Sequence, residues 1–230
     1  MLQGKVALIT GANGGLGAAV TRAFLQAGAQ VHGVAKAIQD SEFSHPAFHA
    51  MPAEIKSADQ ARALVSAVIA RAGQIDALIH RVGGFAGGRT VEDTGSETLD
   101  HMLDVNLRPA FHMLQAVLPP MRARRGGAIV AIGSRTAVTP QPMLGAYSAS
   151  KAALVSLIGT VALECKRDGI TANVVLPGAM DTPANRAANP AADPAQWIQP
   201  DQIAALLVHL ASPAAAQITG AVIPVYGRDL

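Results

Sequence analysis

The sequence contains a single cysteine, Cys165, among its 230 residues. One cysteine cannot form an internal disulfide, and it offers no cluster of thiolate ligands for a metal ion. Such sparse use of cysteine is typical of a reducing, intracellular compartment. We therefore expect a cytoplasmic protein without a metal site.

Aromatic residues make up 3% of the chain and charged residues 15%, whereas half of the residues are hydrophobic. The core must therefore be built from aliphatic side chains, which suits a parallel sheet covered by helices. A chain of 230 residues is the size at which one domain with a single buried core is the default. We expect one domain over residues 1–230.

The chain also lacks a strong charge of either sign, with a formal net charge of +2. Its basic residues are scattered apart from the run "RARR" at 122–125, which we interpret as the solvated end of a helix. Glycines interrupt the apolar N-terminal segment within about a dozen residues, and no uninterrupted apolar run reaches the roughly twenty residues of a membrane span. We predict no nucleic-acid partner and no membrane partner.

Short apolar runs rich in β-branched residues alternate with longer segments of helical period. This alternation predicts βαβ units and a doubly wound, Rossmann-type α/β fold with a seven-stranded parallel sheet and helices on both faces. The expected strands are Lys5–Thr10, Gln30–Val34, Ala47–Pro52, Ala77–Arg81, Ala128–Gly133, Thr171–Leu176 and Ala221–Val225. The expected helices lie near 15–27, 57–72, 97–124, 146–167 and 200–211.

Two segments depart from this alternation. The stretch "AKAIQDSEFSHPAF" between the second and third strands is too short and irregular to hold a full crossover helix with its loops. The proline-rich segment 183–200 follows the sixth strand and contains the only tryptophan, Trp197. A long loop at a strand's carboxyl end favours a substrate lid over a linker, with Trp197 either contacting substrate or anchoring the lid.

A glycine-rich turn follows the first strand in "TGANGGLGAAVTRAFLQAGA", where Gly11, Gly14, Gly15 and Gly17 open the first helix. Glycines let the backbone turn sharply and approach a pyrophosphate, and the free N–H groups at a helix start attract its negative charge. Strand, glycine turn and amphipathic helix together predict a dinucleotide site. A merely tight turn is the alternative.

The second strand ends at Ala35 and Lys36, where an acidic residue usually binds the ribose 2′-hydroxyl of NAD(H). Alanine leaves room for a 2′-phosphate and lysine offers it a positive charge, so the sequence favours NADP(H) over NAD(H). Asp40 could fold back and restore the acid, and Lys36 could be only a solvated loop residue.

Tyr147 and Lys151 stand four residues apart in the apolar helix "GAYSASKAAL". This spacing places both side chains on one face, where an ammonium lowers the pKa of a nearby phenol. Such a tyrosine can donate or accept a proton. Two further polar residues are expected nearby: Ser134 after an apolar strand, and Asn106 within the long helix that Pro109 should kink. Taken alone, Ser134 could be a helix cap and Asn106 could satisfy helix backbone.

These motifs together resemble the classical short-chain dehydrogenase/reductase family. "TGANGGLG" is similar to the family's Thr-Gly-x-x-x-Gly-x-Gly, "YSASK" to its Tyr-x-x-x-Lys, and "LPGAMDTP" to its Pro-Gly segment. Ser134 stands thirteen residues before Tyr147 and Asn106 matches the helix asparagine, as in the family. The resemblance runs from Gly4 to Gly227, with the motifs in the family's order.

The resemblance implies hydride transfer between a nicotinamide dinucleotide and a carbonyl or alcohol carbon of a small molecule. Tyr147 would protonate the developing alkoxide, Ser134 would hydrogen-bond the carbonyl oxygen, Lys151 would hold the nicotinamide ribose, and Asn106 would anchor a water of the proton relay. The remaining implied cofactor contacts are Gly11, Asn13, Gly14, Leu16, Lys36, Glu54, Ile55, Val82, Gly83, Pro177, Gly178, Met180 and Thr182.

After the fourth strand the family pattern Asn-Asn-Ala-Gly is replaced by His80, Arg81, Val82 and Gly83. A buried structural role is the expectation for His80, whereas Arg81 could face the cofactor or form a salt bridge. The block "GGFAGG" resembles the dihydropteridine reductase branch of the superfamily. Ser134 and Ala35 depart from that branch, so a carbonyl substrate is favoured.

Two alternatives to a carbonyl reductase or alcohol dehydrogenase remain. One is a quinonoid dihydropteridine reductase, and the other is a dinucleotide-sensing protein without turnover. Apolar residues extend beyond one face of the helices near 97–124 and 146–167, so we also expect association into a homotetramer or homodimer. The resemblance implies a tetramer built on those helices.

Overall fold

The computed structural model describes residues 1–227, so the last three residues of the predicted 1–230 domain lie outside the described residues. The strands are β1 (Val6–Thr10), β2 (Gln30–Ala35), β3 (Phe48–Pro52), β4 (Ala77–His80), β5 (Gly127–Ile132), β6 (Ile170–Pro177) and β7 (Val222–Val225). The helices are α1 (Gly15–Gln26), α2 (Ala58–Ala72), α3 (Ser96–Asn106), α4 (Arg108–Arg124), α5 (Gly145–Glu164), α6 (Pro183–Ala188) and α7 (Pro200–Leu210).

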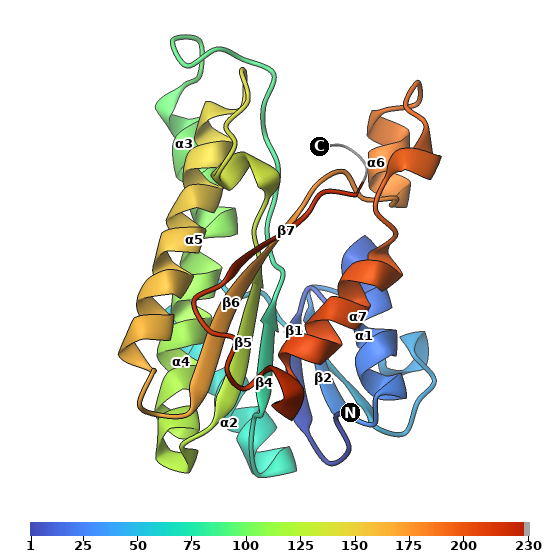
Figure 1. Ribbon diagram of the computed structural model, residues 1–230, viewed down its shortest axis with the longest axis vertical. Coiled ribbons are helices and arrows are strands. Elements are labelled where there is room, and N and C mark those ends of the chain that lie inside the picture. Colours follow the sequence, from blue (N-terminus) through green and yellow to red (C-terminus); the bar gives the residue numbers. More distant parts are fainter. Residues whose placement is uncertain (228–230) are drawn as a thin grey trace.

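The strands form one parallel sheet in the order β3-β2-β1-β4-β5-β6-β7 (Figure 1). The chain winds outward from β1 in one direction and from β4 in the other, so the order reverses between these two strands. In such sheets, ligands bind in the crevice outside the carboxyl ends of the strands at this reversal. The prediction of a doubly wound, seven-stranded sheet is confirmed.

Helices cover both faces of the sheet and bury a separate aliphatic core on each (Figure 1). Helices α2, α4 and α5 pack on one face, and α1 and α7 pack on the other. Strands β1, β4 and β6 are buried along their whole length, which explains why their sequences are continuous apolar runs. Leu8 and Ile9 show the alternation, because adjacent residues of β1 enter opposite cores.

Local sequence signals set the ends of several elements. The hydroxyl of Ser57 accepts a hydrogen bond from the backbone N–H of Gln60 and begins α2, and Gly73 ends it with a φ of 78°. The predicted helix over 97–124 is instead two helices that meet at Leu107. Pro109 has no N–H to donate to the carbonyl of Val105, so the predicted kink is a complete break.

The two irregular segments also differ from plain loops. Between β2 and β3 the chain forms only one short 3-10 turn, Asp40–Glu42, so the predicted absence of a crossover helix is confirmed. The predicted lid 183–200 contains α6 and a second 3-10 turn, Pro194–Gln196. A single β-bridge between Met180 and Ile198 joins its two ends.

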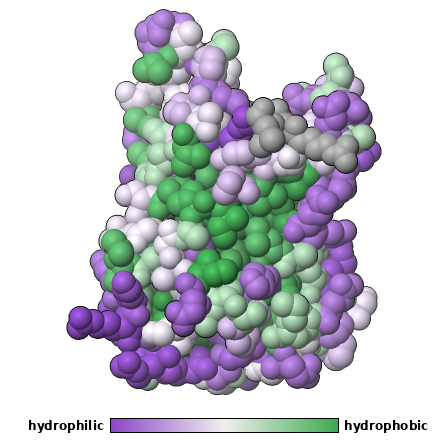
Figure 2. Space-filling model, viewed as in Figure 1, coloured by the Kyte–Doolittle hydropathy of each residue, from purple (hydrophilic) through white to green (hydrophobic). Residues whose placement is uncertain are grey.

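Among residues 1–227, α5 alone is long and apolar enough to cross a membrane, by length and composition only. This helix packs on β6 and α3, and core helices of layered α/β proteins meet the same two criteria. Figure 2 shows a further apolar area over β6 and β7, between α5 and α7. Val222 of β7 is 41% exposed there.

Candidate active site

The glycine turn joins β1 to α1 at the reversal point of the sheet. Gly11 has a φ of 66°, a left-handed conformation that side chains disfavour, and Gly14 caps α1. A Cβ on Gly17 would collide with the carbonyl oxygen of Gly11, so the third glycine permits close packing of helix on strand. Leu16 is buried under the turn, and the Asn13 amide donates to the carbonyl of Ala37. The turn thus has the form that a phosphate cradle requires.

His80 and Arg81 are both tied to Thr10 at the end of the neighbouring strand. The Thr10 hydroxyl lies 3.2 Å from His80 Nδ1 and accepts a hydrogen bond from the Arg81 backbone N–H at 3.1 Å. Burial, with smaller effects from Lys151 and Arg81, lowers the pKa of His80 to about 3, so this imidazole is neutral. Its position supports the predicted structural role, in which it bridges two strands.

The Arg81 side chain turns toward the glycine turn. Its Nη1 donates a hydrogen bond to the carbonyl oxygen of Gly11 and lies 2.7 Å from the place that a Cβ on Gly14 would occupy. Burial lowers the pKa of this guanidinium. Of the two roles left open for Arg81, the structure therefore favours the one that faces the cofactor site.

A cavity of about 770 Å³ opens beside the glycine turn, along the carboxyl ends of β2 and β3. Its walls include seven residues that the sequence analysis considered: Gly11, Ala35, Lys36, Glu54, Ile55, Val82 and Gly83. Tyr147, Lys151 and the 177–182 segment are not part of these walls, so among the predicted contacts the cavity brings together only those that were predicted for the adenosine end of the site.

Charge at the rim of this cavity is positive at the end of β2. Lys36 and Lys56 both pair with Glu54, at 3.2 Å and 2.7 Å, and their hydrogen bonds lower the pKa of that carboxyl. Asp40 does not restore an acid here, because its Oδ1 accepts a hydrogen bond from the Ala50 backbone N–H. Two lysines therefore share one carboxylate beside Ala35.

Tyr147 and Ser134 form the polar centre of the site. Ser134 follows β5, and a hydrogen bond with it lowers the pKa of the half-buried Tyr147, although burial raises that pKa more. The Ser134 hydroxyl also lies 3.1 Å from the hydroxyl of Thr136 and accepts a hydrogen bond from its N–H. Ser134 thus caps the turn and also contacts Tyr147, whereas its predicted role toward a substrate carbonyl stays a prediction.

Lys151 lies one helical turn after Tyr147 and is 6% exposed. Its ammonium donates to the carbonyl of Ile132 at 3.2 Å, and burial together with the charge of Arg81 lowers its pKa to about 8. The expectation that Lys151 lowers the pKa of Tyr147 needs correction. The net direction for the phenol is upward because desolvation dominates, and Ser134 provides the opposing contribution.

Asn106 is fully buried at the end of α3. Its amide oxygen accepts from the Gly84 N–H at 3.0 Å, and its amide nitrogen donates to the Gly84 carbonyl at 3.1 Å and to Ser150 Oγ at 3.0 Å. The side chain therefore binds the loop after β4 and the helix of Tyr147, and within its own helix it donates to the Met102 sulfur at 3.7 Å rather than to the backbone. The water that the resemblance assigns to it remains a prediction.

The predicted nicotinamide contacts lie at the other side of the glycine turn. Pro177 ends β6, and the Gly178 N–H donates to the carbonyl of Val225 at 2.9 Å. Thr182 is buried, caps α6 through the Asn185 N–H, and packs against Gly15, where a Cβ would approach its Cγ2 to 2.9 Å. Met180 pairs with Ile198. The predicted lid thus begins next to the start of α1.

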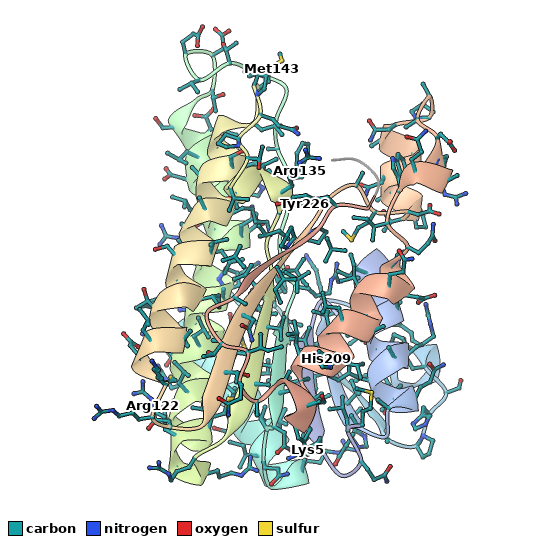
Figure 3. All side chains as sticks on the ribbon, in the orientation of Figure 1. Lys5, Arg122, Arg135, Met143, His209 and Tyr226 are labelled. Atoms are coloured by element: carbon teal, nitrogen blue, oxygen red, sulfur yellow. The ribbon has the colours of Figure 1, made fainter. Side chains whose placement is uncertain are left out.

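Sequence reasoning missed one residue of the site, Phe85. Its ring lies 5.0 Å from that of Tyr147 in an edge-on arrangement and is 67% exposed. The loop that carries it is joined to the segment before α5, since the Gly88 N–H donates to the carbonyl of Met143. Figure 3 places Met143 at the tip of that segment, with Arg135 and Tyr226 between it and the sheet. The signal in the sequence that could have identified it is a lone aromatic residue between two pairs of glycines.

The residues present fit a nicotinamide dinucleotide. The glycine turn offers backbone without Cβ atoms, and the adjoining cavity has the volume and positive rim for a phosphorylated adenosine. Tyr147, Ser134 and Lys151 follow at the carboxyl end of β5, on the far side of the reversal point. One end of this arrangement can bind phosphate and the other can transfer a proton.

Comparisons with known proteins agree with this geometry. The family model described as short chain dehydrogenase matches residues 5–193. The chain belongs to the short-chain dehydrogenase family. It is an NAD(P)-dependent dehydrogenase or reductase of that family, and the sensing alternative without turnover is set aside.

Two curated relatives illustrate the similarity. One is 2,3-dihydro-2,3-dihydroxybenzoate dehydrogenase of Escherichia coli (strain K12), 35% identical over 184 residues, which are 80% of this chain and 73% of the relative. The other is the 3-oxoacyl-[acyl-carrier-protein] reductase FabG of Thermotoga maritima, 30% identical over 241 residues, or 98% of each chain. Neither is a pteridine reductase, and these comparisons give the predicted likeness to that branch no specific support.

Solved structures of this short-chain dehydrogenase fold match the whole chain. The 3-ketoacyl-(acyl-carrier-protein) reductase from Brucella melitensis, complexed with NADH, has a TM-score of 0.87 at 28% identity and covers 100% of this chain and 99% of its own. ElxO with NADP bound has a TM-score of 0.91 at 21% identity and 98% coverage of both chains, which supports the fold. Proteins solved with NADH and with NADP thus share this fold.

Proposed function

We propose that this short-chain dehydrogenase is an NADP(H)-preferring oxidoreductase that interconverts small carbonyl compounds and the corresponding alcohols. The observation that carries the proposal is the hydrogen-bonded pair of Tyr147 and Ser134 one helical turn from Lys151. The names of the relatives, which include reductases of 3-oxoacyl groups and a D-beta-hydroxybutyrate dehydrogenase, support a carbonyl or alcohol carbon as the reacting centre.

Each of these residues would have a separate role in the reaction. The bound dinucleotide supplies or accepts the hydride. Ser134 donates a hydrogen bond to the carbonyl oxygen, and Tyr147 delivers the proton to that oxygen as its negative charge develops. Lys151 is protonated below its pKa of about 8, so at neutral pH its ammonium would donate hydrogen bonds to the hydroxyls of the cofactor ribose.

Positive charge and space at the end of β2 support the preference for NADP(H). Ala35 presents no carboxylate that would repel a 2′-phosphate, and Asp40 is held by the Ala50 N–H. Lys36 is exposed and pairs with Glu54 at the cavity rim, where Lys56 supplies a second cation. A 2′-phosphate could therefore form a charge-assisted hydrogen bond with Lys36.

An apolar entrance supports a small, partly apolar substrate. Phe85 lies edge-on to Tyr147, and Met143 and Val138 are about half exposed nearby in the chain, before α5. Arg135 follows Ser134 and lies over the Tyr226 ring, 4.9 Å from its centroid (Figure 3). These side chains would surround the substrate rather than the dinucleotide.

Steady-state oxidation of NADPH with a panel of small ketones and aldehydes tests the proposal, with the Tyr147→Phe variant beside the parent. Loss of the proton donor should reduce kcat by about 10²- to 10⁴-fold, while the Kd for NADPH stays within about twofold. Thr160→Val is the control, because it removes an exposed hydroxyl from the same helix, thirteen residues after Tyr147. Full turnover by Tyr147→Phe would remove this mechanism.

A further inference from the structure

Arg81 occupies the space that the three turn glycines leave open. Its Nη1 lies 2.7 Å from the Cβ position of each of Gly11, Gly14 and Gly17, and it donates a hydrogen bond to the Gly11 carbonyl. A side chain on any of these glycines would collide with the guanidinium. The glycines therefore make room for a cation as well as for the tight turn.

The surroundings of this guanidinium are electropositive. Within residues 1–227 no carboxylate lies at ion-pair distance from Arg81, and burial is the only cause that changes its pKa. A second cation lies close enough to interact with it, because the charge of Arg81 contributes to the lowered pKa of Lys151. The free N–H groups at the start of α1 add further positive potential.

A partly buried cation without an anionic partner is unfavourable, and an anion that enters its surroundings offsets that cost. A guanidinium is especially suited to phosphate, since its planar set of N–H groups can bind two oxygens at once. The dinucleotide of the proposed function carries a pyrophosphate, and the glycine turn is the place where such folds bind it.

We propose that Arg81 is a cofactor-binding residue whose guanidinium pairs with the pyrophosphate of the dinucleotide, at a position where the family pattern has asparagine. This inference rests on the dinucleotide use of the proposed function. It adds a charged side-chain contact to a turn that otherwise binds phosphate through backbone N–H groups. Arg81 would leave the Gly11 carbonyl and bind the phosphate oxygens instead.

Affinities measured by isothermal titration calorimetry for NADPH, ADP and adenosine, with the parent and Arg81→Asn, test this inference. We expect the variant to bind NADPH and ADP roughly ten- to a hundredfold more weakly, since a buried charged contact is lost. Adenosine has no phosphate, so its affinity should change by less than about threefold. Arg81→Lys keeps the charge without the planar fork and should give an intermediate loss.

Arg167→Asn is the matched control, because Arg167 is exposed just before β6, at the opposite end of the strands from the glycine turn. Circular dichroism of each variant establishes that the fold is retained. If folded Arg81→Asn binds ADP as tightly as the parent, or more tightly, the inference is overturned. The guanidinium would then fill the space beside the turn without binding phosphate. A parent that binds NADPH without reducing any carbonyl would instead remove the proposed reaction and leave the Arg81 result standing.

Discussion

Asn106 binds both backbone polar groups of Gly84, accepting from its N–H at 3.0 Å and donating to its carbonyl at 3.1 Å. The same amide nitrogen donates to Ser150 Oγ, which in turn donates to the carbonyl of Tyr147 at 2.7 Å. One buried side chain thus links the loop after β4 to the first turn of α5. The arrangement fixes the loop of Phe85 and the helix of Tyr147 relative to each other.

Replacing Asn106 by alanine should lower the free energy of unfolding by about 2–4 kcal/mol, because buried polar groups of Gly84 and Ser150 lose their partner. Urea unfolding followed by circular dichroism measures the change. Asn189→Ala serves as the control, since Asn189 is exposed and its side-chain amide makes a long hydrogen bond, to the Asn185 carbonyl at 3.4 Å. A loss below about 0.5 kcal/mol for Asn106→Ala would contradict the stabilising role.

Local patterns in the sequence were enough to predict the sheet, the glycine turn and the spacing of Tyr147 and Lys151. Each depends on residues close together in the chain: alternating apolar runs for the strands, and i, i+4 geometry for the pair. The sequence also predicted a kink at Pro109, because the missing N–H of proline is a local property. The structure has a break at Leu107 instead.

Long-range side-chain packing was not predictable in the same way. The path of the Arg81 side chain into the glycine turn depends on contacts between residues 70 positions apart in the sequence. The edge-on contact of Phe85 with Tyr147 requires the loop after β4 to meet the start of α5. The upward pKa of Tyr147 was missed because helical spacing reveals the neighbouring ammonium but not the degree of burial.

Lys36→Ala should weaken the binding of NADPH by about tenfold and that of NADH by less than about twofold, because only NADPH carries the 2′-phosphate. Fluorescence titration of both dinucleotides measures this difference. Lys166→Ala, an exposed lysine just after α5, should change neither affinity and controls for net charge. A parent that binds NADH more tightly than NADPH would contradict the proposed preference.

The neutral, buried His80 should make the fold sensitive to acid. Its pKa is about 3 in the folded chain, below the ordinary value of 6.5, so between these values only the unfolded chain binds a proton. Stability from this group is therefore complete above pH 6.5 and is lost as the pH falls toward 3. At pH 5 the loss should be about 2 kcal/mol relative to pH 7.

His80→Asn removes this titration while keeping a polar partner for Thr10. Chemical unfolding of parent and variant at pH 7 and pH 5 should show that the parent loses about 2 kcal/mol more than the variant on acidification. The buried His32, whose pKa burial lowers to about 4, contributes equally to both proteins and cancels in the comparison. The exposed His101 provides the control substitution, His101→Asn. Equal losses in parent and His80→Asn would refute the assignment.

The outer face of α4 and α5 should form a contact between copies of the chain. A groove of about 620 Å³ runs between these helices and is lined by apolar side chains that include Leu107, Phe111 and Leu157. Phe111 is 47% exposed, and α5 continues with Leu163, which is 77% exposed. Exposed aliphatic and aromatic side chains in a row are typical of surfaces that associate.

Phe111→Glu should dissociate the assembly, since the new carboxylate would be buried at the interface without a partner. Light scattering at micromolar concentration should show a dimer or tetramer for the parent and a smaller species for this variant. Val91→Glu adds the same charge at a site that is 75% exposed in the loop before α3, and it should leave the mass unchanged. Val222→Glu separately tests the apolar area over β7 (Figure 2). If a tetramer uses both this area and the α4–α5 face, either substitution should convert it to a dimer. A parent that is monomeric under these conditions would exclude both contacts.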